Sequence, residues 1–439
     1  MRKMCKFGLR PMMMAAFALC TLATTAQEKL ALTLDQAIEI ALSDNPTIQV
    51  AEQTIELKKI SNKETALGLL PEASLSGAYT RTIKKQMVKI GDMEPIPMGV
   101  NNQYQGGVTV SLPIFAPTLY KSMKLTKTDV ALAVEQARAS KQDLINQVTK
   151  AFYQALLAQD SYAVLQKAFA QSEENYRIVN AKYEQGKVSE FDKISAEVQM
   201  RNMQPSVISA RNGVELSKLQ LLVLMNIEPE TEIELQGSLN DYEEAVFAGV
   251  LTADTSSLKS NSTLAQLDMN VKMLQQSLSI NKQSFAPIVA LQFNYMYTCM
   301  AEDFKFKDYM WKPYSNVSLS VSVPLFKYSN FSAVKKTNLQ ISQLMTNRDY
   351  TARQLAMQQQ SYLNSMAASA EQVSSNKEAI VQAQKGRDIA EKLYEVGRGT
   401  VLELNSAEVA LTQAKLTYTQ AIFDYLSAKA DLDKLQGKE

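Results

Sequence analysis

The chain has 439 residues, a formal net charge of +1 and no histidine. This length allows one large core or more than one domain, and the balanced charge argues against nucleic acid as a partner. The lack of histidine excludes Ser-His and Cys-His nucleophile pairs and removes the usual zinc ligand. Hydrolysis without a cofactor is therefore disfavoured, while catalysis by carboxylates stays open. No cofactor and no metal is expected.

Residues 1–26 have the pattern of a secretory signal peptide. Basic residues precede a short apolar run from Met12 to Ala23, and small residues then suit cleavage after Ala26. The residue before Cys20 is Leu19 and not a small residue, so a lipoprotein anchor is not expected. Cleavage would leave Cys299 as the single thiol, which predicts no internal disulfide and a small apolar role for this side chain.

Four later segments alternate apolar and polar residues, as β-strands do, at about 72–81, 103–113, 287–298 and 315–324. Two of them end in similar phrases, "VTVSLPIF" from Val108 to Phe115 and "LSVSVPLF" from Leu319 to Phe326. The pattern fits membrane-barrel strands with polar residues inside, and it fits half-buried strands of a soluble sheet as well. Trp311, Tyr309 and Tyr314 follow the third strand, either as a membrane-interface girdle or as an ordinary aromatic cluster.

The rest of the chain has helical patterning. We expect a break near Pro46 and a kink at Pro205, because proline interrupts the helical hydrogen-bond ladder. A segment at about 226–260 mixes short alternation with turn residues. In chain order the expected helices are 35–70, 117–184, 191–225, 261–286, 327–395 and 402–435.

The chain repeats itself. Asn45 to Pro71 aligns with Asn261 to Pro287 at an offset of 216, and the later segments align at 211, including "KYEQGKVSEFDKISAEV" with "LYEVGRGTVLELNSAEV". Proline stands at all four helix–strand junctions, where the chain changes from helix to strand or from strand to helix. We expect two repeats, 27–260 and 261–439, each made of helix, strand, strand, long helix, tight turn and returning helix. Their helical tips lie near 185–191 and 396–401.

The lengths of these elements suggest an assembly. The uninterrupted run 117–184 would form a helix of about 100 Å, and the half-length helices before and after it would each span about 50 Å. Two half-length helices end to end would therefore match one long one. Helices of this length need neighbours, as in coiled coils. Four strands cannot close around water, whereas three copies supply twelve. The sequence predicts a mainly α chain with a small β part, whose homotrimer forms a twelve-stranded β-barrel that continues into a long α-helical tunnel.

With these motifs the chain resembles the TolC-type outer-membrane efflux family over nearly its whole mature length. The resemblance rests on the duplicated plan, on "LTLDQAIEIALSDNP" near the start, and on the tips "YEQGKVSEFD" and "YEVGRGTVLEL". It implies a trimeric exit duct in the outer membrane of a Gram-negative bacterium, serving a tripartite efflux pump or a type I secretion system. The implied partners are outer-membrane lipid, a periplasmic adaptor and an inner-membrane pump driven by protons or by ATP.

The resemblance also implies a gate near the turns. Asp192 matches an acidic gating residue of the first turn, Tyr394 matches a gate tyrosine of the second, and Glu403 matches a carboxylate of the lumen. From the residues alone, Asp192 and Glu403 equally fit acidic residues at a helix start, where the helix dipole favours negative charge.

Two positions depart from the family pattern. Gly399 stands in place of a gating arginine, for which the neighbouring Arg398 would substitute, and Ser406 stands in place of a second lumen carboxylate. The resemblance further implies that an adaptor grips the exposed tips. The tip residues are Gly186, Lys187, Val188, Ser189, Gly397, Gly399, Thr400 and Val401.

Two other classes of function remain open from the residues alone. The first is a secreted trimeric coiled-coil adhesin or scaffold without a pore, which would have no need of strands with a continuous polar face. The second is a periplasmic enzyme, which the missing histidines and the absence of a catalytic motif disfavour. No catalytic residue and no metal ligand is therefore expected.

Overall fold

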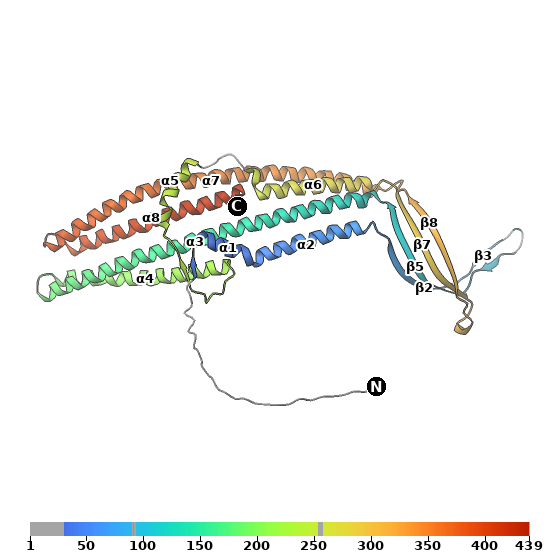
Figure 1. Ribbon diagram of the computed structural model, residues 1–439, viewed down its shortest axis with the longest axis horizontal. Helices are drawn as coiled ribbons and strands as arrows, with labels where there is room; N and C mark the ends of the chain where they lie inside the picture. Colours follow the sequence, from blue (N-terminus) through green and yellow to red (C-terminus); the bar gives the residue numbers. More distant parts are fainter. Residues whose placement is uncertain (1–29, 90, 92–93, 253–257, 439) are drawn as a thin grey trace, which may run out of the picture.

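A computed structural model describes residues 30–89, 91, 94–252 and 258–438. The molecule is long, with a curved sheet at one end and the tips of two helical hairpins at the other (Figure 1). The expected signal peptide lies outside the described residues. No helix in the described part of the chain has an apolar stretch that could cross a lipid bilayer.

The sheet consists of four antiparallel strands in the order β2-β5-β7-β8. Their bounds are β2 (Glu72–Arg81), β5 (Asn102–Phe115), β7 (Ile288–Ala301) and β8 (Lys312–Ser322). The loop between β2 and β5 also forms a small hairpin of β3 (Gln86–Val88) and β4 (Ile96–Met98), which the sequence pattern does not predict. A 3-10 turn, η3 (Phe306–Asp308), lies between β7 and β8.

The register of the strands gives the sheet one apolar and one polar face. Val110 pairs with Phe293, and Phe293 pairs with Val317, so apolar side chains share a face. On the opposite face, Thr109 Oγ1 donates to Asn294 Oδ1 at 2.8 Å, and Asn294 Nδ2 donates to Asn316 Oδ1 at 2.9 Å. These polar contacts therefore connect β5, β7 and β8 on the face of the sheet opposite the apolar one.

The helices occur as pairs of matching length, one from each half of the sequence. The long helices α3 (Pro117–Glu184) and α7 (Tyr328–Glu395) both have 68 residues. The other pairs are α2 (Pro46–Leu67) with α6 (Ser262–Gln283), and α4 (Glu190–Leu224) with α8 (Val401–Gln436). Hairpins α3–α4 and α7–α8 point away from the sheet, while α2 and α6 accompany the sheet-side halves (Figure 1). The break expected near Pro46 separates α1 (Leu34–Asp44) from α2, whereas α4 continues through Pro205.

A single asparagine joins two half-length helices at each of two positions. Asn45 Oδ1 caps α2 by accepting from Thr47 N at 2.8 Å, and its Nδ2 donates to Leu224 O, at the end of α4, at 2.8 Å. Asn261 Oδ1 likewise accepts from Leu264 N at 3.0 Å to cap α6, and its Nδ2 donates to Leu435 O of α8 at 2.8 Å. Both asparagines are buried, with 6% and 5% of their surface exposed. Each therefore satisfies orphan groups of two helix ends at once.

At each junction, a residue with a left-handed backbone conformation stands at the end of the helix that returns from the tip, α4 or α8. Asn226, with φ of 57°, follows α4 and donates from its side chain to Asp44 O at 3.2 Å. Gly437, with φ of 73°, ends α8, and a Cβ there would lie 2.2 Å from Ser260 O. The first junction thus accepts a side chain at this position, whereas the second has room only for glycine.

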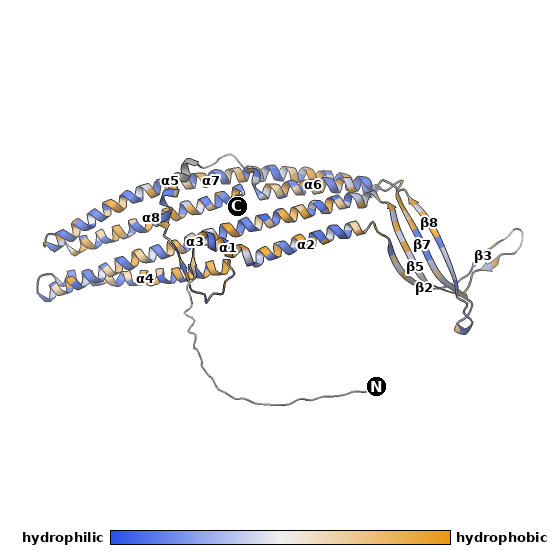
Figure 2. Cartoon of the chain, viewed as in Figure 1, coloured by the Kyte–Doolittle hydropathy of each residue, from blue (hydrophilic) through white to orange (hydrophobic). Residues whose placement is uncertain are grey.

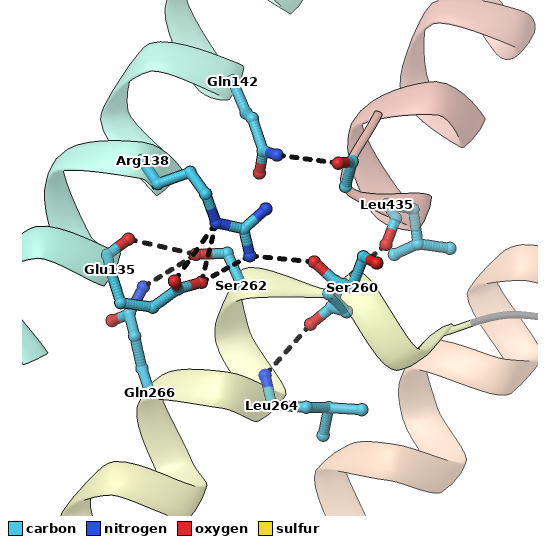
Figure 3. A network of polar contacts seen from close by, with 10 residues as sticks. Glu135, Arg138, Gln142, Ser260, Ser262, Leu264, Gln266 and Leu435 are labelled. Carbon is cyan, nitrogen blue, oxygen red and sulfur yellow. Dashed lines mark hydrogen bonds and ion pairs between the residues drawn. The ribbon is translucent and has the colours of Figure 1, made fainter. Parts of the chain in front are cut away.

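The second junction is also tied to α3, as Figure 3 shows. Arg138 Nη2 donates to Ser260 O at 2.9 Å and pairs with Glu135, while Gln142 Nε2 donates to Gly437 O at 3.0 Å. Ser262 Oγ donates to the Glu135 carbonyl at 3.3 Å. These contacts fix the long helix against the point where α6 and α8 meet.

The main hydrophobic core lies at the same position along the length of the molecule as these junctions. Strand β1 (Leu30–Leu32) pairs in parallel with β6 (Ile233–Leu235), and η1 (Leu239–Tyr242), α5 (Glu243–Thr252) and η2 (Leu258–Ser260) follow β6 in the chain. Fully buried side chains from this segment and from the helices fill the core, among them Phe152, Leu156, Leu239, Ile422 and Tyr425. Figure 2 shows that apolar and polar residues alternate along every helix, so burial depends on which face packs inward.

Replacing the junction asparagine separates its two roles. Asn261→Ser keeps a capping oxygen but cannot reach Leu435 O, and should cost about 1 kcal/mol, whereas Asn261→Ala loses both contacts and should cost about 2–3 kcal/mol. Urea unfolding followed by circular dichroism in detergent measures both. Asn364→Ala is the control, because Asn364 is exposed and, among the described residues, its side chain bonds only Gln360 of its own helix. A serine variant as stable as the parent would show that the bond to Leu435 adds nothing.

Candidate functional site

The two tight turns at the ends of the hairpins have the same backbone structure. In the first, Gly186 has φ of 69°, and Lys187 N donates to Lys182 O at 2.9 Å. In the second, Gly397 has φ of 73°, and Arg398 N donates to Leu393 O at 2.9 Å. A Cβ on either glycine would meet nothing within 4 Å, so glycine is required for its positive φ and not for space.

The acidic residues that follow the turns both cap helices. Ser189 N and Oγ donate to Asp192 Oδ2 at 3.2 and 2.7 Å, and Asp192 N donates back to Ser189 Oγ. Thr400 N donates to Glu403 Oε2 at 2.8 Å, and Glu403 N donates to Thr400 Oγ1 at 3.2 Å. The Thr400 N–H, followed by its hydroxyl, holds the pKa of the exposed Glu403 carboxyl below its ordinary value. The helix-start role that the residues alone suggested is therefore present at both positions.

Tyr394 connects the two hairpins through its ring. Lys182 Nζ of α3 lies 4.3 Å from the centroid of the Tyr394 ring on α7. The Tyr394 hydroxyl is buried and has no hydrogen-bond partner among the described residues. Burial, and next the negative charge of Asp192, raise the pKa of this hydroxyl. The cation–π contact, rather than a hydroxyl bond, therefore acts between the hairpins within one chain.

A small apolar core lies beneath the turns. Val179 of α3, Ala196 of α4 and Val401 of α8 are buried together, and Tyr176, Val188 and Tyr394 pack around them. Val401 has only 3% of its surface exposed, so this expected tip residue holds the hairpins together and offers no free side chain. The exposed tip positions are Gly186, Lys187, Ser189, Gly397, Arg398 and Thr400.

Glu408 is a buried carboxylate that the sequence reasoning missed. It has 9% of its surface exposed and accepts from Asn175 Nδ2 of α3 at 2.7 Å. Burial is the main cause that raises its pKa. The repeated phrase "SAEV" could have revealed this glutamate. In the first repeat Glu197 pairs with Arg201, one turn later, at 2.7 Å. In the second repeat Thr412 stands where that arginine would be, so the equivalent Glu408 lacks this ion pair. Thr412 donates only to the Glu408 carbonyl, at 2.8 Å, and the Glu408 carboxylate instead accepts from Asn175 of α3.

Glu408 also borders a cavity of about 770 Å³ between the two hairpins. Charged side chains line this cavity, including Asp160, Lys167, Arg387 and Lys415. Asp160 Oδ2 accepts from Ser238 Oγ at 3.0 Å and from Leu239 N at 2.9 Å, which joins the cavity wall to η1. Burial raises the pKa of Asp160, but both of its bonds serve to fix a turn. No three acidic, cysteine or histidine side chains in the described part of the chain come together as a metal site.

Comparison with known protein families gives one match over most of the chain. The family described as "Outer membrane efflux protein" matches residues 37–226 and 246–438. The chain is 21% identical to the outer membrane protein TolC of Vibrio cholerae, over 98% of this chain and 95% of the relative. It is 23% identical to the alkaline protease secretion protein AprF of Pseudomonas aeruginosa, over 92% and 84%.

Solved structures show the same fold. VceC, an outer membrane protein of Vibrio cholerae, superposes with a TM-score of 0.73 at 15% identity, covering 92% of this chain and 96% of that one. The Campylobacter jejuni outer membrane channel CmeC gives a TM-score of 0.72 at 15% identity, with 92% and 85% covered. The expectation of a mainly helical chain with a small sheet, which rested on the repeat and the strand pattern, is confirmed.

The contact between Lys182 and Tyr394 can be tested apart from the hydroxyl. Lys182→Met should remove about 0.5–1 kcal/mol and speed amide hydrogen exchange at residues 186–189, whereas Tyr394→Phe keeps the ring and should leave the exchange unchanged. Mass spectrometry of peptides from the tip measures both. If Tyr394→Phe accelerates exchange as much as Lys182→Met, the hydroxyl holds the tip through a group outside the single chain.

Proposed function

The chain belongs to the outer membrane efflux protein family, and we propose that three copies of it form one exit duct for an efflux pump or a type I secretion system. Such a duct conducts substrates passively from the periplasm, through the outer membrane, to the exterior of a Gram-negative cell. The observation that carries the proposal is the sheet, which has one apolar face, one polar face and two open edges. Members of this family are channels, and the chain is not proposed to catalyse a reaction.

The open edges support assembly into a barrel. Within the described residues β2 and β8 each pair on one side only, and both are exposed along their whole length. Unpaired edges attract further strands, and four strands are too few to enclose water. Three copies would supply twelve strands, with Val317, Leu319 and Val321 toward lipid. The polar chain from Thr109 to Asn316 would then face the lumen.

The internal repeat predicts the register in which β8 of one copy would pair with β2 of the next. Within the chain, β5 and β7 join the two halves, and Val108 pairs with Tyr295. The offsets of 211 and 216 carry β5 onto β8 and β7 onto β2. Applied to Val108 and Tyr295, the offsets place Leu319 opposite Tyr79 of the next copy. Applied to the adjacent pair in the sheet, they place Ser320 opposite Ala78. Apolar residues then share the lipid face and polar residues the lumen face across the joint, which the offsets alone do not require.

The helices support the same mapping. Within the chain α3 packs against both α6 and α8, which meet at Asn261. By the same offsets, α7 would pack against α2 and α4 of the next copy, which meet at Asn45. Gln276 Nε2 donates to Thr128 Oγ1 at 2.9 Å inside the chain. The corresponding pair between copies is Leu339 with Ile60, two apolar side chains that are 64% and 47% exposed in the single chain. Burial of this pair would favour assembly.

The gate and the partners are also part of the proposal. Asp192, Tyr394, Arg398 and Glu403 lie together at the end of the hairpins away from the sheet, which is where a periplasmic entrance would be. A periplasmic adaptor would contact the exposed tips and connect them to an inner-membrane pump. The two repeats, 27–260 and 261–439, would act as quasi-equivalent units of a sixfold tube. No observation favours the adhesin alternative.

Disulfide trapping tests the assembly. Ser320→Cys with Ala78→Cys, in a Cys299→Ser background, should give a trimeric ladder on non-reducing gels, because these residues face each other on the lumen side of the proposed joint. The control is Ser320→Cys with Ser76→Cys, which shifts the register by two residues and should crosslink weakly. Equal crosslinking of both pairs would reject the register, and monomeric bands with silent lipid bilayers would reject the duct.

Ion selectivity tests the position of Glu403. In a trimer its carboxylate would occur three times around one axis, so Glu403→Gln should reduce the preference for cations, measured as a reversal potential in a salt gradient. Because the pKa of Glu403 is lowered, the parent should keep its preference as pH falls to about 4, the ordinary glutamate value, and lose it only below that.

The matched control for this change is Glu56→Gln. Glu56 is on α2, far from the tips, and pairs with Lys59 of its own helix. Its replacement should leave selectivity unchanged. Identical reversal potentials for the parent and Glu403→Gln at every pH would remove Glu403 from the lumen.

A further inference from the structure

The polar face of the four-stranded sheet consists of rows of side chains that cross all four strands, and the register of the strand pairs defines four such rows. From the helix side outward, the rows are Glu72, Ser111, Gln292 and Ser318; Ser74, Thr109, Asn294 and Asn316; Ser76, Gly107, Met296 and Tyr314; and Ala78, Gln105, Thr298 and Lys312. A charged residue occurs only in the first row, as Glu72, and in the last, as Lys312.

The neighbours of Lys312 place its side chain on the polar face. Successive residues of a strand point to opposite faces of the sheet. The ring of Trp311, the residue before Lys312, lies 6.4 Å from the ring of Tyr104 on the apolar face. Asn316, four residues after Lys312, accepts from Asn294 on the polar face at 2.9 Å. Lys312 therefore points to the same side of the sheet as Asn316.

Glu72 lies on the same face at the other end of the sheet. It is the first residue of β2 and pairs with Ser111 of β5. The next polar pair along these strands is Ser74 with Thr109, and Thr109 donates to Asn294 on the polar face at 2.8 Å. Like Lys312, Glu72 is exposed, and among the described residues neither side chain forms an ion pair.

The side chains between the two charged positions are neutral, and several of them bond to one another. The bonds from Thr109 to Asn294 and from Asn294 to Asn316 connect three strands. Gln292 Nε2 also donates to Asn294 Oδ1, at 3.5 Å. Amide groups that are bonded across the sheet have fewer donors and acceptors left for a passing solute. This middle part of the face therefore offers no charge and few strong contacts.

The two charged positions are far enough apart to act separately. Lys312 lies six residues before Ser318 in β8, and Ser318 is in the same row as Glu72. At about 3.3 Å per residue, the distance along the strands is about 20 Å. The Debye length is about 8 Å at physiological ionic strength, so each charge has its own field along the face.

We propose that Glu72 and Lys312 determine the charge specificity of the barrel. The proposal rests on the proposed trimeric duct, in which each residue would occur three times around the lumen. A ring of carboxylates would then stand at the inner end of the barrel and a ring of ammonium groups at the outer end. A cation is repelled by one ring and an anion by the other, whereas a solute without net charge meets no repulsive ring. The barrel would therefore favour neutral and zwitterionic solutes.

Two rings of opposite charge should make the channel pass current better in one direction. With the tip side positive, cations enter past Glu72 and anions enter past Lys312, so both kinds of ion accumulate between the rings. The opposite voltage depletes them. The ratio of the two currents, measured on single channels in planar bilayers, reports the rings. Protein is added to one side only, so that all channels insert in the same direction.

Neutralising both rings tests the proposal. Glu72→Gln with Lys312→Gln should lower this current ratio by about 1.5-fold at 0.01 M salt, where the Debye length is about 30 Å, and leave it unchanged at 1 M, where it is about 3 Å. Exchanging the charges, by Glu72→Lys with Lys312→Glu, should lower the ratio further. A neutral variant that keeps the parent ratio at 0.01 M salt would overturn the proposal, as would an exchanged variant that matches the neutral one.

Arg81→Gln is the matched control. Arg81 is a cation at the outer end of β2, but it has the strand parity of Tyr79 on the apolar face and lies 5.1 Å from the centroid of the Phe304 ring. Its replacement should leave the ratio unchanged at both salt concentrations. Conductance equal to that of the parent at 1 M salt shows that a variant forms the same pore, and the neutral variant decides the test if the exchanged one does not insert. A parent chain that gives silent bilayers would instead reject the duct itself.

Discussion

The side chain of an asparagine at mid-length is the interaction on which the architecture depends. A helix of 68 residues presents a side that no half-length helix can cover alone, so two must meet end to end along it. Their ends would leave amide and carbonyl groups without partners in a buried place, at a substantial cost. Asn45 and Asn261 satisfy both ends at once, as a cap for one helix and a donor to the other. This arrangement places the sheet and the helical tips at opposite ends of the molecule.

Because of the internal repeat, a contact between helices inside the chain has an equivalent pair of positions on the surface of the chain, and the residues at the two places differ. Inside the chain, polar pairs such as Thr128 with Gln276 join neighbouring helices. At the matching positions the single chain exposes Leu339 and Ile60, which is typical of surfaces that become buried on assembly. At the tips, Val401 is buried within the chain, whereas its counterpart Glu190 is exposed.

The acidic residues at the tips show how a structural role and a transport role can coincide. Asp192 and Glu403 each complete a capping box, which fixes the start of α4 and of α8. The bonds from Thr400 lower the pKa of the Glu403 carboxyl, so the geometry that stabilises the start of α8 also favours the ionised form of Glu403. In the proposed duct this would favour a negative charge at the entrance. Glu408, five residues further on, has the opposite environment and belongs to the interior between the hairpins.

The sequence by itself determined the long helices, the four strands of the main sheet and their order, because alternation, helical spacing, proline at the helix–strand junctions and glycine at the tips are local properties of the chain. The 211-residue repeat also predicted that α3 and α7 would match in length and that both tips would share one turn. The tertiary structure decided which partner each side chain finds. Nothing in the local pattern shows that Asn45 reaches the end of α4, that Glu408 bonds Asn175, or that Val401 is buried whereas its counterpart Glu190 is exposed. These outcomes depend on contacts between segments about 180 to 230 residues apart in the chain, and such contacts exist only once the helices pack.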